Sequence, residues 1–123
     1  MSARLARTIG ATTAASGAGL LLAPGTALRL MGAQTTDPAP FLFRIVGLFM
    51  AISGATLVDG GRAPLALRWS LVQKVGATTA MCWGVRNGTY SRRALAVAAF
   101  DGASAVLLAG LILRGDRRGA GTA

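Results

Sequence analysis

Two ionisable residues, Lys74 and Asp101, stand within long apolar stretches of this sequence of 123 residues. An isolated charge in apolar surroundings is strongly unfavourable, so each residue requires an opposite charge or an aqueous cavity. If the two stretches are adjacent membrane-spanning helices, a rise of 1.5 Å per residue puts the two positions about 6 Å apart in depth. An extended lysine bridges that gap, and the sequence therefore predicts a pair between Lys74 and Asp101.

Two further polar residues extend this pair to a predicted intramembrane polar cluster of Lys74, Asp101, Arg44 and Gln73. Arg44 lies about one turn inside its own apolar stretch, so its long side chain can reach inward as a second partner or snorkel outward. Gln73 directly precedes Lys74. The cluster has two interpretations that the sequence leaves open. It is either an ion pair that fixes the register of the helices or a polar site for a ligand, an ion or a proton.

The absence of several residue types excludes some kinds of catalytic site and metal site. The chain has no histidine and no glutamate, and Cys82 is its one cysteine. An intrachain disulfide, a histidine-based catalytic triad and a cluster of thiolate metal ligands are therefore excluded. We predict no metal site and no cofactor. No residue is identified as catalytic, and the sequence leaves open whether the protein is an enzyme.

The composition of the chain is typical of a membrane protein. Hydrophobic residues make up 53% of the sequence and charged residues 14%, whereas roughly a quarter of a soluble domain is charged. The formal net charge is +9, but the basic residues stand between apolar runs and form no stripe interleaved with aromatic side chains. We assign them to the flanks of membrane-spanning segments, and nucleic acid is not an expected partner.

Four apolar stretches approach the length of about 20 residues that a helix needs to cross the hydrocarbon core. They cover approximately residues 2–23, 41–58, 66–85 and 94–113. We therefore predict an all-α fold, a transmembrane four-helix bundle that forms a single domain over residues 1–123.

The first stretch is the least apolar of the four, being rich in Ala, Thr and Gly. It meets Pro24, which disfavours helical geometry at Ala23 and predicts the end of the helix there. The following Leu28, Leu30 and Met31 suit a short interfacial helix. The charged start MSARLAR also permits a secretory signal, but the mild hydrophobicity of ATTAASGAG and the lack of an A-x-A site argue against cleavage.

Positive charge in the loops predicts the orientation. If all four stretches span the membrane, both termini lie on one side together with seven arginines, and the other side holds five. Since positively charged loops tend to stay in the cytoplasm, we predict a multi-pass protein of the cell membrane with both termini cytoplasmic.

A spaced repeat links the first two apolar stretches. The segment from residue 7 to residue 20 aligns without gaps on the segment from residue 44 to residue 57. In both copies the spacing G-x-x-x-A-x-x-G sets small residues on one helical face, and small faces let backbones approach closely in lipid. We therefore predict that helices pack at Gly10, Gly17, Gly47 and Gly54, with a ligand groove as the alternative.

Several motifs resemble those of a known family. In chain order they are LLLAPGTALRLMG, a loop with proline, FRIVGLFMAISGATLV, ALRWSLVQK and AAFDGASAVLLAG. From about Gly17 to Leu113 the chain resembles the DoxX-like group of small four-helix integral membrane proteins. The resemblance implies a four-helix membrane bundle. Some members of the wider group are associated with thiosulfate-to-quinone electron transfer or oxidative-stress responses, but no residue here carries such an activity over.

Three functions are compatible with these features. The first prediction is a non-catalytic accessory or partner subunit in the lipid bilayer, which acts with another membrane protein or as a homo-oligomer. The second is a membrane-embedded enzyme or binding protein for a hydrophobic small molecule such as a quinone or an isoprenoid, with Asp101 as its proton-handling group. The third is a proton- or ion-coupled transporter that works as a dimer.

Overall fold

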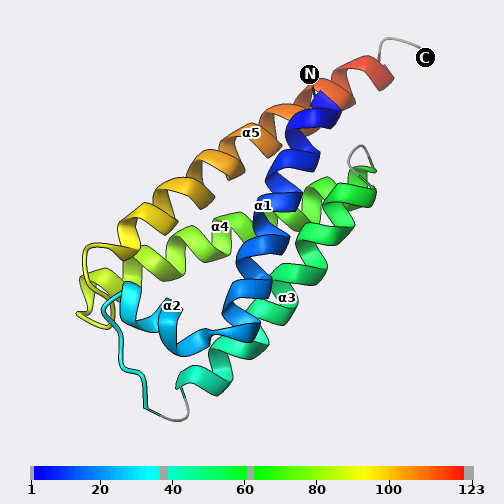
Figure 1. The fold of residues 1–123 in the computed structure, drawn as a ribbon. Helices are drawn as coiled ribbons and strands as arrows, with labels where there is room; N and C mark the ends of the chain where they lie inside the picture. Colours follow the sequence, from blue (N-terminus) through cyan, green and yellow to red (C-terminus); the bar gives the residue numbers. More distant parts are fainter. Residues whose placement is uncertain (1, 37–38, 61–62, 121–123) are drawn as a thin grey trace.

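The computed structural model describes residues 2–36, 39–60 and 63–120. These residues form five helices and no strand, which confirms the all-α prediction. The helices are α1 (Ser2–Leu22), α2 (Pro24–Leu30), α3 (Ala39–Asp59), α4 (Pro64–Arg86) and α5 (Ala94–Ala120) (Figure 1). The four long helices coincide with the four predicted stretches. The largest difference is at α5, which continues past the predicted residue 113 through a segment rich in arginine.

Proline determines where two of the helices begin. Pro24 and Pro64 each stand at the start of a helix, where the fixed φ is compatible with helix and the missing N–H is not needed. Ala23, which precedes Pro24, has φ −134° and ψ 60°, outside the helical region, as expected for a residue before proline. The chain therefore breaks between α1 and α2 and forms the short helix predicted after the first stretch.

The helices are arranged as two antiparallel pairs (Figure 1). One pair consists of α1 and α3, and the other is the hairpin of α4 and α5. The small-residue repeat lies between α1 and α3. A Cβ built on Gly10 would lie 2.7 Å from the carbonyl oxygen of Gly54, and one built on Gly47 would lie 2.6 Å from that of Gly17. The two copies of the repeat therefore pack against each other, and the structure places all four predicted glycines at this contact.

One end of the molecule is held together by an apolar core. Its buried residues come from all four long helices and are Ala6, Ile9, Leu57, Leu67 and Leu108. The first turns of α1 and the last turns of α5 meet at this end (Figure 1).

The opposite end of the molecule is bridged by α2 and the turn between α4 and α5. Leu28 of α2 is buried, and the backbone N–H of Ser91 donates a hydrogen bond of 2.8 Å to the carbonyl of Met31. The two helix pairs are thus joined at both ends, and the space between them lies in the middle of the fold.

Two of the described helices are long and apolar enough to cross a membrane. They are α3, over Ala39–Asp59, and α5, over Ala94–Arg118. The other two long helices are less apolar, since α1 is rich in Ala, Thr and Gly and α4 carries Arg68 and Lys74 within its length. Length and composition therefore support membrane spans at α3 and α5.

Candidate functional site

Lys74 of α4 and Asp101 of α5 form a buried ion pair. The Nζ atom of Lys74 lies 2.6 Å from Oδ1 of Asp101, and the two side chains are only 1% and 4% exposed. The structure thus brings together the two residues that the sequence singled out. Burial at this level strengthens the attraction between the charges and also makes the loss of either partner costly.

Small residues beside the pair let α4 and α5 approach each other. Ala98, Ser104 and Ala105 are buried on the face of α5 that carries Asp101, and Ser70 is buried one turn before Lys74. These are positions that the sequence assigns to the interior faces of the two helices. With no bulky side chains there, the lysine ammonium reaches the carboxylate directly.

The ammonium of Lys74 also contacts an aromatic ring. Nζ lies 5.0 Å from the ring centroid of Phe100, which is within the range of a cation–π interaction. Of the three N–H donors of an ammonium group, one is used by Asp101. Within residues 2–36, 39–60 and 63–120, no further hydrogen-bond acceptor is assigned to Nζ, so two donors are available to another molecule.

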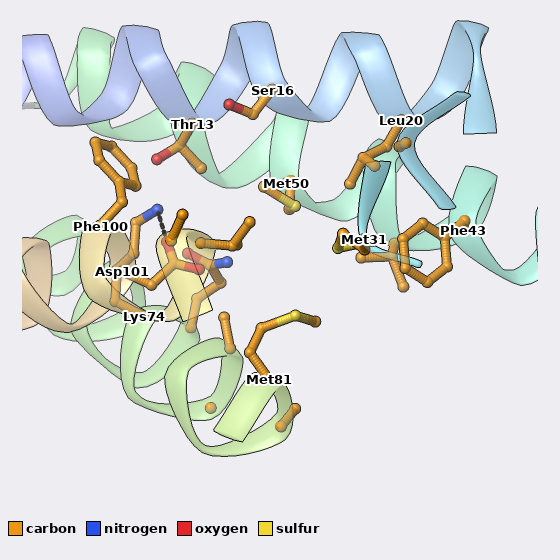
Figure 2. A pocket seen from close by; sticks show the side chains of 18 of the residues that line it. Thr13, Ser16, Leu20, Met31, Phe43, Met50, Lys74, Met81, Phe100 and Asp101 are labelled. Atoms are coloured by element: carbon orange, nitrogen blue, oxygen red, sulfur yellow. Dashed lines mark hydrogen bonds and ion pairs between the residues drawn. The ribbon is translucent and has the colours of Figure 1, made fainter. Parts of the chain in front are cut away.

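The ion pair forms part of the wall of a cavity of about 750 Å³ between the two helix pairs. All five helices contribute to this wall, which is mostly apolar and includes Met31, Met50 and Met81 (Figure 2). Methionine side chains are flexible and adapt to irregular contents. Volume and lining fit the usual ligand pocket, which is largely apolar and holds a few placed polar groups.

Thr13 of α1 faces the ion pair across this cavity. Figure 2 shows Thr13 and Ser16 pointing from α1 towards the side on which Lys74 and Asp101 lie. Thr13 is only 2% exposed, and its Oγ1 has no hydrogen-bond partner among the described residues. Such an unpaired buried hydroxyl is unfavourable, and a ligand in the cavity would satisfy it.

Other threonines in the long helices behave differently. Their hydroxyls donate to the backbone carbonyl four residues earlier, as at Thr8, Thr12, Thr56, Thr78 and Thr79. This local bond is the ordinary way for a helical threonine to satisfy its hydroxyl. Thr13 does not make it. Thr13 was not among the residues predicted from the sequence, although its spacing from Gly10 and Gly17 places it on the same buried face of α1.

Gln73 lies on the wall of the main cavity and also on that of a second, smaller one. The second cavity has a volume of about 380 Å³ and lies between α3 and α4, next to Trp69. The Oε1 atom of Gln73 is buried and has no partner among the described residues. Gln73 thus lines the same cavity as Lys74 and Asp101.

Arg44 is not brought to the ion pair. Its Nη1 donates a hydrogen bond of 2.7 Å to the carbonyl of Leu21, at the end of α1. The last carbonyls of a helix lack partners within the helix, and a positive charge there interacts favourably with the helix dipole. The prediction that placed Arg44 in the polar cluster is therefore corrected: this side chain caps α1.

Tyr90, in the turn between α4 and α5, also lines the cavity. Burial raises the pKa of its phenol above the ordinary value, because the ionised form loses hydration. Its ring packs on Gly84, where a Cβ would meet the ring carbons. Tyr90 is thus a neutral side chain under ordinary conditions, and sequence reasoning did not single it out.

Metal ligands do not gather in the part of the chain that the structure describes. No group of three or more His, Cys, Asp or Glu side chains occurs there, and Cys82 is free and exposed.

Comparison with known proteins found no matching family model, no matching curated protein and no matching solved structure.

Proposed function

We propose that this chain is a multi-pass membrane protein that binds a hydrophobic small molecule in the cavity between its two helix pairs. The observation that carries the proposal is the cavity itself. It is large enough for a ligand, largely apolar, and polar at the position of Lys74 and Asp101. This is the binding-protein alternative that the sequence left open, for which a quinone or an isoprenoid was the expected ligand.

The distribution of side chains supports placement in a bilayer. Large apolar residues are exposed on the outside, with Phe49 at 66%, Trp83 at 67% and Val106 at 72%, while the only lysine is buried. Soluble proteins rarely expose continuous apolar surface on this scale. In the proposal, α1, α3, α4 and α5 form a transmembrane four-helix bundle, and the DoxX-like resemblance supports the same architecture.

The cavity offers a route for a ligand from the lipid. Four large apolar residues of its wall are themselves exposed, namely Leu30, Val46, Val97 and Phe100. These residues come from α2, α3 and α5, so the cavity communicates with the outside along the gap between the helix pairs. In a bilayer this opening would face acyl chains, which is where a hydrophobic ligand accumulates.

Gly76 permits a direct test of the proposal. It lies on the wall of the cavity, and a Cβ added to it meets nothing within 4 Å. We expect Gly76→Leu to fold and to place its side chain in the free space, so that the purified protein retains several-fold less bound lipid. Extraction of the purified protein followed by mass spectrometry measures the bound molecule.

Gly110→Leu is the matched control. Gly110 also lies within a helix with nothing within 4 Å of an added Cβ, but it is not part of the cavity wall. Both substitutions replace glycine by a better helix former. The control should retain the bound molecule at the wild-type level. Equal retention by Gly76→Leu, or a wild-type protein without a bound hydrophobic molecule, would contradict the proposed function.

The orientation can be tested with reporter fusions. The count of seven arginines against five predicts that fusions at both ends of the chain report a cytoplasmic location. The first turns of α1 and the last turns of α5 lie at one end of the fold, so both reporters should agree (Figure 1). Opposite locations would mean that one long helix does not span, and α1 would be the first to examine.

A further inference from the structure

The polar end of the cavity carries hydrogen-bonding groups from two helices, and the inference drawn from them rests on the proposed function. Thr13 reaches it from α1, and Lys74 and Gln73 reach it from α4. Thr13 Oγ1 and Gln73 Oε1 are buried without partners in the described chain, and Lys74 has N–H donors to spare. Donors and acceptors of hydrogen bonds therefore face the same space.

The charges of Lys74 and Asp101 determine which polar head group of a ligand the site can accept. Asp101 already neutralises Lys74 at 2.6 Å, so the wall carries no net charge at this point. A ligand carboxylate would place a second negative charge beside Asp101 with one ammonium to share, and like charges in a buried site repel strongly. A cationic head would meet the same obstacle at Lys74. The site therefore favours a neutral head.

Hydrogen bonding selects further among neutral heads. A ligand hydroxyl both accepts and donates, so it can accept from Lys74 Nζ and from the Thr13 hydroxyl while it donates to Gln73 Oε1. A carbonyl or an ether can accept from the same two donors but cannot donate, which leaves Gln73 Oε1 unpaired. Groups left unpaired in this way discriminate strongly between ligands that are otherwise alike.

We propose that the cavity binds a long-chain alcohol, with its hydroxyl between Lys74 and Thr13, and that Asp101 excludes the corresponding fatty acid. The ligand would bridge the two helix pairs, since Thr13 belongs to α1 and Lys74 to α4. Asp101 acts as a specificity-determining residue because it cancels the charge that would otherwise attract a carboxylate.

Three probes with the same chain test this proposal, namely dodecanol, dodecyl methyl ether and dodecanoate at a pH where the acid is ionised. Binding is measured as the ligand-dependent rise in the melting temperature of the purified full-length protein in a neutral detergent. Wild-type protein should bind dodecanol about tenfold more tightly than the ether, which leaves a buried acceptor unpaired, or the carboxylate, which Asp101 repels.

Two variants are expected to change the binding of these probes in different ways. Asp101→Asn removes the negative charge and leaves Lys74 positive, so dodecanoate should become the preferred probe by about tenfold. Thr13→Val keeps the branched shape and removes the hydroxyl, so dodecanol affinity should fall severalfold without a gain for dodecanoate. Thr8→Val is the control, since the Thr8 hydroxyl is exposed and already donates to Arg4. This control should bind as the wild type does.

Equal binding of dodecanol and dodecanoate by the wild type would overturn the inference, and so would unchanged dodecanol affinity in Thr13→Val. If Asp101→Asn does not fold, the comparison of Thr13→Val with Thr8→Val decides alone.

Gly76→Leu separates this inference from the proposed function. If all three probes bind equally and Gly76→Leu abolishes their binding, the cavity is a ligand site and only the head-group inference fails. If no probe binds the wild type, the inference is wrong.

Discussion

Replacing Asp101 with alanine is expected to lower the free energy of unfolding by about 3–5 kcal/mol, the usual effect of removing one partner of a buried ion pair. The substitution leaves the ammonium of Lys74 buried without its counter-charge, since the two side chains are 1% and 4% exposed and 2.6 Å apart. Unfolding of the purified protein in mixed micelles, followed by circular dichroism, measures this loss.

Lys74→Met provides the second half of the experiment. The double variant with Asp101→Ala removes both charges, so it should be clearly more stable than Asp101→Ala alone, since an apolar replacement for a buried pair is often close to neutral. The double-mutant cycle then gives the coupling between the two residues. Strictly additive losses would mean that the two charges do not interact and would contradict the observed pair.

Replacing Gly17 with leucine is expected to destabilise the protein by about 1–3 kcal/mol or more, as for overpacked interiors. A Cβ at this position would lie 2.6 Å from the carbonyl oxygen of Gly47 and 2.9 Å from the carbonyl carbon of Met50. Both atoms belong to the backbone of α3, which cannot move aside as a flexible side chain can. The two helices would have to separate, with loss of the close packing that associates helices in lipid.

Gly19 supplies the matched control for this prediction. It lies two residues further along α1, and a Cβ added there meets nothing within 4 Å. Gly19→Leu should therefore unfold at the wild-type midpoint or slightly above it. Gly54→Leu should behave like Gly17→Leu, since its Cβ would lie 2.5 Å from the carbonyl oxygen of Gly10. Tolerance of leucine at both Gly17 and Gly54 would show that α1 and α3 do not pack at this face.

The positions of the helices follow from local properties of the chain. Apolar stretches of nearly membrane-spanning length, interrupted by Pro24 and Pro64, predict the four long helices and the break before α2. These features act within a few residues, because proline restricts its own φ and the conformation of the residue before it. The arginine-rich continuation of α5 was missed because its polarity ends the apolar stretch without ending the helix.

The ion pair was also predictable, because the unfavourable burial of a charge applies wherever the fold places it. Lys74 and Asp101 each lie within an apolar stretch and at similar depth, so their positions in the sequence suggested that they meet. For Arg44 the same reasoning left two directions open, and the side chain reaches the end of α1 instead. Its position near the start of α3 puts the unpaired carbonyl of Leu21 within reach, and this depends on how α1 and α3 are paired.

The sequence by itself determined the helices, the small-residue faces and the need of the two buried charges for each other, since each follows from residue type and spacing along one chain segment. Only the tertiary structure decided that the two copies of the repeat pack on each other in antiparallel orientation, so that Gly10 meets Gly54 and Gly17 meets Gly47. The same packing turns Thr13 towards the ion pair and leaves the cavity between the helix pairs. A cavity is defined by atoms that are distant in sequence, and its volume depends on the distances between helices, which no local pattern of residues specifies.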